Sequence, residues 1–348
     1  MNPYVLSILL FGLGLGTMTA FASSHWLLAW MGLEINTLAI IPLMAQQHHP
    51  RAVEATTKYF LTQAAAAATL LFASTTNAWL TGQWDIKQMA HPFPVTIITL
   101  ALALKMGLAP LHAWLPEVLQ GLDLTTGLIL STWQKLAPFS LFLQIQTFNP
   151  TMLILLGLTS TLVGGWGGLN QTQLRKILAY SSIAHLGWMI LIMQFSPSLT
   201  LLALTTYLIM TFSTFLVFKL NKATNINALA SSWAKMPTIT ALTPLVLLSL
   251  GGLPPLTGFM PKWLILQELT KQALPLTATM AALTALLSLY FYLRLCYAMT
   301  LTVSPNNLTG TTPWRLKSLQ STLPSAITIS MTICLLPLTP ATMALMNT

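Results

Sequence analysis

The chain has 348 residues, of which 55% are hydrophobic and only 6% are charged. A soluble domain carries about 25% charged residues, so this composition excludes a large soluble protein and indicates a membrane-embedded chain. The formal net charge of +9 does not indicate nucleic-acid binding, because the basic residues form no run and accompany no recognition module. An excess of basic residues in the loops of one membrane side is the simpler explanation.

Eleven apolar segments are predicted to cross the membrane as helices. Most have 20–25 residues, which is the length that a hydrocarbon core of about 30 Å requires. The first is too long for the core of a signal peptide. The segments run over 3–22, 25–45, 56–80, 94–120, 124–146, 150–170, 175–194, 199–220, 237–273, 276–300 and 323–346.

The fourth and ninth segments carry the same interruption. The pattern Gly-Leu-x-Pro-Leu occurs at 107–111 and again at 252–256, 145 residues later. Proline removes a helical donor, and irregular backbone at membrane depth survives only inside protein or beside a water-filled cavity. Paired interruptions are typical of internally repeated transporter folds and of their ion sites. The alternative is two ordinary proline kinks.

The basic residues other than Lys105, Lys135 and Lys262 predict the topology. With alternating spans, ten of them fall on the side of the N-terminus, and only Lys87 and Lys271 on the other. Splitting the ninth segment in two would reduce this asymmetry to eight against four, so one long broken helix is favoured, with the C-terminus on the opposite side. The ten are Arg51, Lys58, Arg175, Lys176, Lys219, Lys222, Lys235, Arg294, Arg315 and Lys317.

Four ionisable residues lie inside predicted spans: Glu34, Lys105, Lys135 and Lys262. Each costs about 2.5–3.5 kcal/mol on insertion scales, and together they would cost about as much as the net stability of a whole domain. They are therefore expected to face one another, water or polar backbone. Because one glutamate cannot neutralise three lysines, a water-linked proton relay is the functional interpretation. A static polar network that fixes helix packing is the alternative.

Two histidines inside spans are further candidates. His112 follows the first interruption and His185 lies near the middle of the seventh segment, so either could carry protons near neutral pH or serve in packing. No metal-ligand spacing, nucleophilic triad or glycine-rich nucleotide loop is present. Cys296 and Cys334, the only cysteines, exclude an iron–sulfur cluster held by this chain alone.

At these residues the sequence resembles the subunit 2 family of mitochondrial NADH dehydrogenase (respiratory complex I) in its vertebrate form. The strings that carry the likeness are 30–36, 105–116, 133–138, 181–187 and 251–262. The resemblance implies one antiporter-like domain over 1–348. Its two inverted repeats, at about 25–170 and 175–300, would each contain one broken helix, and a C-terminal helix would follow at about 323–346. It also implies the mitochondrial inner membrane, with the N-terminus in the matrix and the C-terminus in the intermembrane space.

The resemblance also implies roles for single residues. Glu34 would pair with Lys105, Lys135 would be the central lysine of the proton path, Lys262 the distal lysine, and His112 and His185 the polar links. No cofactor is expected in this chain, since other subunits would bind NADH, FMN, the iron–sulfur clusters and ubiquinone. The expected partners are other membrane-arm subunits of complex I, including neighbouring antiporter-like subunits, and lipids such as cardiolipin.

Three functions remain open at this point. The first is a proton-translocating subunit in which Lys105, biased by Glu34, acts on Lys135, which exchanges a proton with Lys262. The second is a self-sufficient cation/proton antiporter, and the third is a structural spacer with a silent polar axis. Assembly and turnover measured on the same charge-removing variant would separate them.

Overall fold

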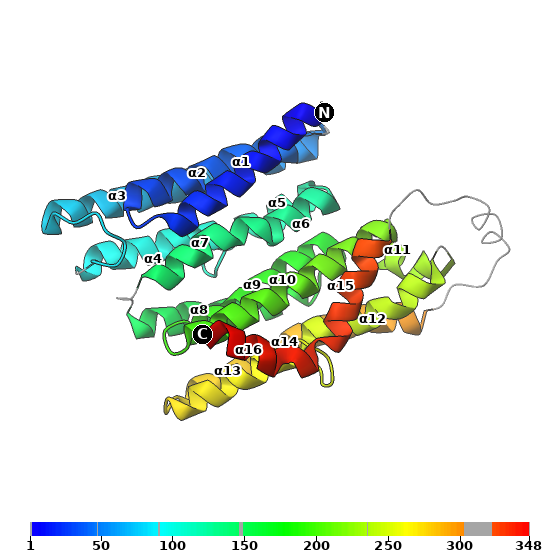
Figure 1. Cartoon of the computed structure of the whole chain (residues 1–348). Helices are drawn as coiled ribbons and strands as arrows, with labels where there is room; N and C mark the ends of the chain where they lie inside the picture. Colours follow the sequence, from blue (N-terminus) through cyan, green and yellow to red (C-terminus); the bar gives the residue numbers. More distant parts are fainter. Residues whose placement is uncertain are drawn as a thin grey trace. The chain divides into compact units, whose positions relative to one another are not determined.

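The computed structural model of the chain describes residues 2–46, 48–89, 91–145, 149–234, 236–302 and 322–347. Its regular structure there is helical, apart from two isolated β-bridges, so the predicted all-α class is confirmed. The chain divides into two compact units, Met1–Thr159 and Ser160–Thr348, and the division falls inside helix α8 (Pro150–Gly168) (Figure 1). Of the basic residues used to predict the topology, Lys235, Arg315 and Lys317 lie outside the described residues.

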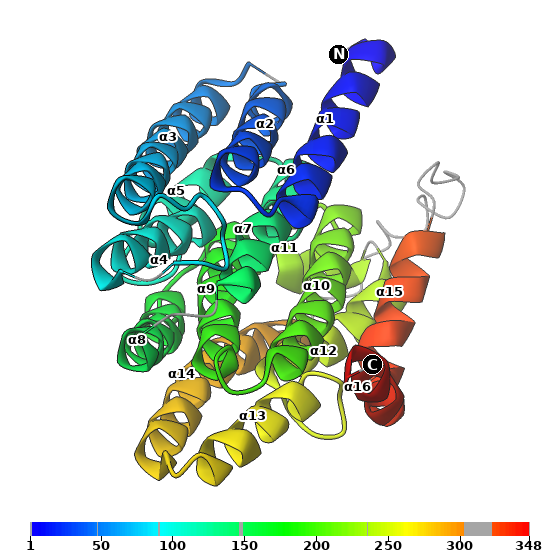
Figure 2. The ribbon, with the colours of Figure 1, turned by 60° about the vertical axis from the view of Figure 1, so that its left-hand side comes forward.

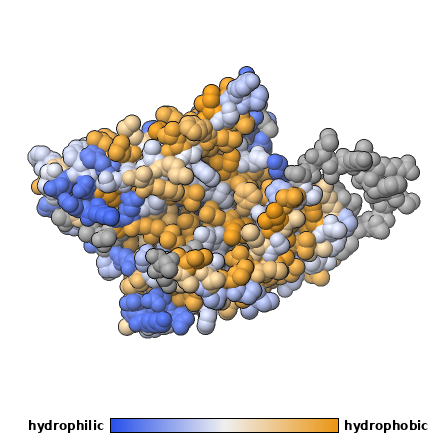
Figure 3. Space-filling model, in the orientation of Figure 1, coloured by the Kyte–Doolittle hydropathy of each residue, from blue (hydrophilic) through white to orange (hydrophobic). Residues whose placement is uncertain are grey.

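The surface of the protein is largely apolar, as a lipid-facing surface must be. Helix α1 (Pro3–Ala22) exposes Ile8, Phe11, Leu15 and Met18, which recur at helical spacing along one face. Apolar residues also cover much of the face seen in Figure 3. Soluble monomers rarely expose apolar patches beyond a few hundred Å², so the membrane interpretation holds.

Five described helices are long and apolar enough to cross a membrane, or six if a bent pair at the C-terminus counts as one span. They are α1, α2 (Trp26–Met44), α8, α10 (Pro197–Leu220) and α14 (Pro275–Thr300). Several other predicted spans are interrupted, which shortens their helices: α4 (Pro92–Met106) and α12 (Pro237–Gly251) have 15 residues each, about 22 Å. The total of eleven spans therefore stays a prediction.

In the first unit, α1 packs closely against α2, and α2 against α3 (Pro50–Thr81) (Figure 2). Glycines make the first approach possible, because a Cβ atom on Gly16 would lie 2.8 Å from the carbonyl oxygen of Gly32. Helix α3 also packs against α4 and α5 (Trp114–Gly121), and α7 (Trp133–Gln144) contacts α1, α2 and α4. These contacts surround the space that becomes the first site.

In the second unit, α10 lies against α9 (Leu174–Ile192), α12, α13 (Phe259–Lys271) and α15 (Leu323–Cys334). Helix α14 packs along α12 and contacts the short helix α11 (Ile226–Ala230). The predicted C-terminal helix at 323–346 is not straight, because α15 and the segment Leu336–Leu345, which contains most of α16 (Thr339–Asn347), meet at 68°.

Both predicted interruptions are confirmed, and they have the same backbone geometry. Gly107 ends α4 with φ +79°, and Gly252 ends α12 with φ +81°, a left-handed conformation that glycine adopts readily. The following leucine donates its N–H five residues back, from Leu108 to Ala103 over 2.9 Å and from Leu253 to Leu248 over 3.3 Å. These bonds form a Schellman cap, which satisfies carbonyl groups that the broken helix would otherwise leave unpaired.

A second backbone feature also occurs once in each unit. The loop before α2 pairs with the loop after α3, where Trp26 N–H donates to Trp84 and Ile86 N–H to Ser24 over 3.1 and 2.9 Å. The loop before α9 pairs with the loop after α10 in the same way. There Leu174 N–H donates to Thr224 and Ile226 N–H to Thr172, over 3.1 and 3.2 Å.

The fifth predicted span also contains an interruption, which the sequence did not indicate. Helix α6 (Leu124–Ser131) ends at Ser131 and α7 begins at Trp133, with Thr132 between them. The hydroxyl groups of Ser131 and Thr132 both donate to the Leu128 carbonyl oxygen, over 3.0 and 2.7 Å. Such back-bonding competes with the helical ladder and bends helices.

Candidate functional site

Lys105 is held in the last turn of α4, just before the break at Gly107. Its side chain is 7% exposed, and its ammonium nitrogen has no hydrogen-bond acceptor among the described residues. A cation in this turn is stabilised by the partial negative charge at the C-terminal end of the helix. The break therefore supplies Lys105 with a favourable field without a carboxylate in contact.

Lys135 follows the interruption at Thr132 and lies in the first turn of α7. It is 3% exposed, so it is buried as the sequence predicts. Its neighbour Gln134 donates from its side-chain amide to the backbone carbonyl of Asn36 over 3.3 Å. Helix α7 is thereby joined to α2, the helix that carries Glu34.

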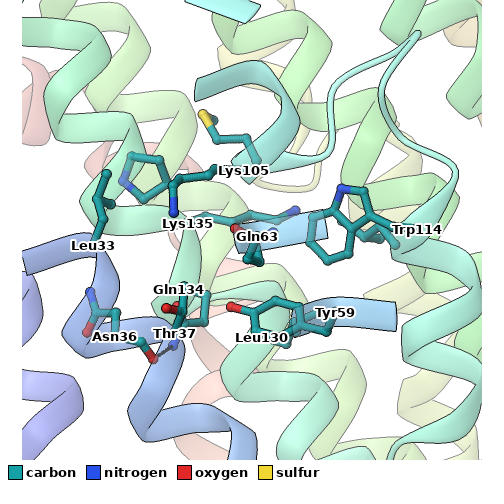
Figure 4. A pocket seen from close by; sticks show the side chains of 13 residues that line it. Leu33, Asn36, Thr37, Tyr59, Gln63, Lys105, Trp114, Leu130, Gln134 and Lys135 are labelled. Atoms are coloured by element: carbon teal, nitrogen blue, oxygen red, sulfur yellow. Dashed lines mark hydrogen bonds between the residues drawn. The ribbon is translucent and has the colours of Figure 1, made fainter. Parts of the chain in front are cut away.

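Lys105 and Lys135 line the same cavity in the first unit, which measures about 20 Å³. A space of at least about 10–15 Å³ measured in this way admits a water molecule. Polar side chains from α2, α3 and α7 share the lining (Figure 4). The polar and aromatic members are Asn36, Thr37, Tyr59, Gln63, Trp114 and Gln134. Two of the predicted site lysines thus come together around one small polar space.

Glu34 lies beside this cavity but does not line it. Leu33, Asn36 and Thr37 face the cavity at helical spacing, which turns Glu34 to the side of that face. Its carboxylate acts electrostatically on Lys105 and on Tyr59, but no ion pair joins Glu34 to Lys105 among the described residues. The two charges interact across a gap rather than in contact.

Five buried polar atoms in and beside the cavity have no hydrogen-bond partner within the described protein. They are Asn36 Nδ2 and Oδ1, Gln63 Nε2, Lys105 Nζ and Glu34 Oε2. Leaving one buried polar group unsatisfied costs about 1–3 kcal/mol, so five would cost roughly 5–15 kcal/mol, as much as the net stability of a typical domain. These atoms require a polar partner that the described residues do not provide, and water is the partner that the space admits.

Lys262 forms a second site beside the break in the second unit. It lies in the first turn of α13, and its ammonium nitrogen donates to the Gly251 carbonyl oxygen over 2.8 Å. Gly251 is the last residue of α12, so the lysine pairs with a helix end that carries partial negative charge. A Cβ atom at Gly252 would lie 2.9–3.1 Å from the Lys262 side chain, and glycine there gives the lysine room.

His185 lines a second, smaller cavity together with Lys262. The cavity measures about 10 Å³, enough for one water molecule at most. The His185 ring lies 5.6 Å from the ring of Tyr207. These two residues lie on α9 and α10, and both helices pack against α13. His185 and Lys262 thus share one small cavity within the second unit.

His112, like Glu34, is a site candidate that lines neither lysine cavity. It lies in the turn between α4 and α5, where its Nδ1 atom is 3.3 Å from the Pro110 carbonyl oxygen. The sequence placed it near the break correctly, and its contact with Pro110 lies within the same turn.

Sequence reasoning missed the neutral members of the first site. The predicted site consists of charged residues and histidines. Its neutral members are Asn36, Tyr59, Gln63 and Gln134, which carry no charge. The sequence did carry a signal for two of them, since Asn36 and Gln63 are amides inside apolar segments. The structure buries both, at 2% and 4% exposure. Among the described residues, no group of three histidine, cysteine, aspartate or glutamate side chains could hold a metal ion.

The sequence and the fold of this chain match those of known proteins. The family model described as NADH:quinone oxidoreductase/Mrp antiporter, TM, matches residues 23–288, and the model of the NADH dehydrogenase subunit 2 C-terminus matches residues 289–343. NADH-ubiquinone oxidoreductase chain 2 of Tetraodon nigroviridis is 75% identical, and that of Gadus morhua 74%, each over 347 residues and 100% of both chains.

Solved structures agree with these matches. A chain of respiratory complex I from Thermus thermophilus with bound aureothin has a TM-score of 0.87 and 27% identity, over 99% of this chain and 80% of that one. A chain of the Mrp complex from Dietzia shares the fold, with a TM-score of 0.80 and 16% identity over 95% of this chain and 74% of that one. The fold is therefore that of a membrane subunit in the NADH:quinone oxidoreductase and Mrp antiporter class. More narrowly, the chain belongs to the family of NADH-ubiquinone oxidoreductase chain 2, which confirms the resemblance seen in its sequence.

Proposed function

We propose that the chain is a proton-translocating, antiporter-like subunit of the membrane arm of respiratory complex I. The observation that carries this proposal is the polar cavity shared by Lys105 and Lys135, with Glu34 acting on Lys105 from its side. A buried lysine is costly in a membrane protein, and two around one space that admits water are best explained by proton transfer between them. Membership of the chain 2 family supports the same assignment.

In this mechanism the Glu34 carboxylate attracts the Lys105 ammonium group, and a change in that attraction alters the charge facing Lys135. A proton then passes across the polar cavity between the two lysines. Lys135 in turn exchanges a proton with Lys262, whose ammonium group is held by the Gly251 carbonyl oxygen. His185, which lines the Lys262 cavity, is the proposed relay in the second unit. His112 is the second proposed relay, although it lines neither cavity.

The proposal includes the architecture that the family implies, with eleven spans and two inverted repeats. The two breaks with one backbone geometry, and the two loop pairings with one hydrogen-bond pattern, support the repeats. An odd number of spans in the first repeat would start the second from the opposite membrane side, which inverts it. We place the chain in the mitochondrial inner membrane, with its N-terminus in the matrix and its C-terminus in the intermembrane space.

The other subunits complete the enzyme in this proposal. This chain holds no cofactor, and NADH, FMN, the iron–sulfur clusters and ubiquinone bind elsewhere in the complex. Its partners are the other membrane-arm subunits, including neighbouring antiporter-like subunits, with cardiolipin among the surrounding lipids. Electron transfer would reach this chain only as a change of charge or conformation passed along the membrane arm.

The test is Lys135→Met in the assembled complex, reconstituted in vesicles with NADH and ubiquinone. Proton translocation is expected to fall sharply while the complex still assembles. Lys262→Met is expected to act in the same direction. Lys271→Met on the same helix is the matched control, because its side chain is 62% exposed. Normal pumping by Lys135→Met would reject the proposal.

Two other outcomes identify the rival functions. Equal loss of assembly and pumping in Lys135→Met would indicate a structural spacer. Sodium/proton exchange by the purified chain alone in vesicles would indicate a self-sufficient antiporter.

A further inference from the structure

The neutral amides of Asn36 and Gln63 line the cavity of the first unit, and the proposed proton path gives them no role. We propose that together they bind the water that carries protons between Lys105 and Lys135, and that they are positioning residues for this transfer. The inference rests on the proposed function of those two lysines. It adds the groups that hold the conducting water in place.

Asn36 is placed as a water ligand by the packing of α1 on α2. Its side chain is 2% exposed, and neither its amide nitrogen nor its amide oxygen has a hydrogen-bond partner in the described part of the chain. A Cβ atom at Gly16 would lie 2.6 Å from the Asn36 side-chain oxygen, so α1 closes over the amide on that side. The other side faces the cavity that Lys105 and Lys135 line. An amide nitrogen carries two N–H donors, so Asn36 can donate to a water molecule in that cavity.

Gln63 approaches the same cavity from α3 (Figure 4). It is 4% exposed, and its amide nitrogen has no protein acceptor. Tyr59 lies one turn earlier on α3 and lines the cavity too. It also interacts electrostatically with the carboxylate of Glu34. Gln63 and Tyr59 therefore extend the polar lining from the lysines toward Glu34, which does not line the cavity itself.

Neutral side chains suit this task for a physical reason. A further carboxylate would hold one lysine in its charged form, whereas an amide hydrogen-bonds to water whatever charge the lysines carry. The cavity of about 20 Å³ leaves space for very few water molecules, so their position depends on the groups around them. Two amides on different helices can fix that position.

The experiment compares Asn36→Leu and Gln63→Met, which keep the side-chain shape and remove the polar atoms, in assembled complex I in vesicles. If the amides served only packing, apolar groups of the same shape would leave both assembly and pumping unchanged. If they hold water, we expect NADH-driven proton translocation to fall by about fivefold in each variant, the factor that one lost hydrogen bond of about 1 kcal/mol gives. Gln63→Asn, which keeps an amide and leaves space for one more water, should recover part of the rate.

Asn77→Leu is the matched control, because it removes another buried amide from α3 that does not line this cavity. It is expected to pump protons in the normal ratio to electrons. Normal pumping by Asn36→Leu and Gln63→Met would overturn the inference, and if Lys135→Met pumped normally, the proposed function itself would fail. Should the variants not assemble, a map of the wild-type complex decides. Water density within hydrogen-bonding distance of both amides supports the inference, and protein atoms in that place overturn it.

Discussion

The side-chain amide of Gln134 donates to the backbone carbonyl of Asn36 over 3.3 Å, which joins the residue before Lys135 to the residue two positions after Glu34. The bond connects α7 to α2 across 98 positions of the sequence. It fixes the spacing of Glu34 and Lys135, because each of these two residues lies within two positions of one end of the bond. A change in the spacing of α2 and α7 would alter the electrostatic interaction between these charges.

Gln134→Met is expected to loosen α7 without unfolding the unit. The substitution removes one hydrogen bond, worth about 1 kcal/mol in net stability, while the Asn36 carbonyl keeps its helical donor. Hydrogen–deuterium exchange of α7 in the assembled complex should become about fivefold faster, the factor that corresponds to this free energy. Unchanged exchange of α7 would show that this bond does not hold it.

Gly252→Ala is expected to damage the second site more than its backbone strain alone explains. A residue with a side chain at φ +81° costs about 1–2 kcal/mol, and the new Cβ would also lie 2.9–3.1 Å from Lys262. Gly82→Ala is the control for strain, because Gly82 has φ +73° and nothing lies within 4 Å of its added Cβ. Proton translocation is measured for the two variants at equal amounts of assembled complex. The additional loss in Gly252→Ala is the part of the loss that comes from the displacement of Lys262. Equal losses would contradict the expectation.

Gly16→Ala is expected to separate α1 from α2. The added methyl group would lie 2.6 Å from the Asn36 side-chain oxygen and 2.8 Å from the Gly32 carbonyl oxygen, and the second of these is backbone and cannot move aside alone. Overpacking of this kind costs about 1–3 kcal/mol. The amount of assembled complex that survives graded heating should fall. Gly14→Ala, on the same helix with nothing within 4 Å, should leave it unchanged or slightly raised.

Lys58→Met is expected to change the titration of Glu54. The hydrogen bond from Lys58, with its charge, lowers the pKa of Glu54 below its ordinary value of 4.5. A lowered pKa contributes stability that is present above the ordinary value and is lost as the pH falls through the lowered one. Without Lys58 the pKa returns toward its ordinary value. A water-soluble carbodiimide, which reacts with protonated carboxyl groups, should then label Glu54 more strongly near pH 4.5. Equal labelling in wild type and variant would exclude the link.

The sequence predicted the breaks because their chemistry is local. Glycine at 107 and 252 supplies the left-handed turn and the proline two or three residues later prevents the helix from continuing. The break at Thr132 escaped prediction because hydroxyl back-bonding from Ser131 and Thr132 is optional, and other serines and threonines do the same inside continuous helices. Its occurrence depends on how the helix packs.

The charged members of the site were predictable because buried charge is rare in a membrane protein. Their partners were not. Whether Lys105 faces a carboxylate or an amide depends on the rotation of α2 and α3, which apolar segments without a polar face do not specify. Lys262 was expected to face another charge, water or polar backbone, and its observed partner is the Gly251 carbonyl oxygen, 11 positions earlier across the break. Only the folded path of the chain brings the two together.

That carbonyl partner has a consequence for how a lysine in this position can be switched. A carboxylate can accept the proton from a lysine and cancel both charges, whereas a peptide oxygen is too weak a base to keep one. The negative pole that faces Lys262 is therefore permanent, and it moves only when the end of α12 moves. A mechanical displacement of a half-helix would change the charge balance there directly. Such a lysine converts movement of the backbone into a change of electric field, and the reverse.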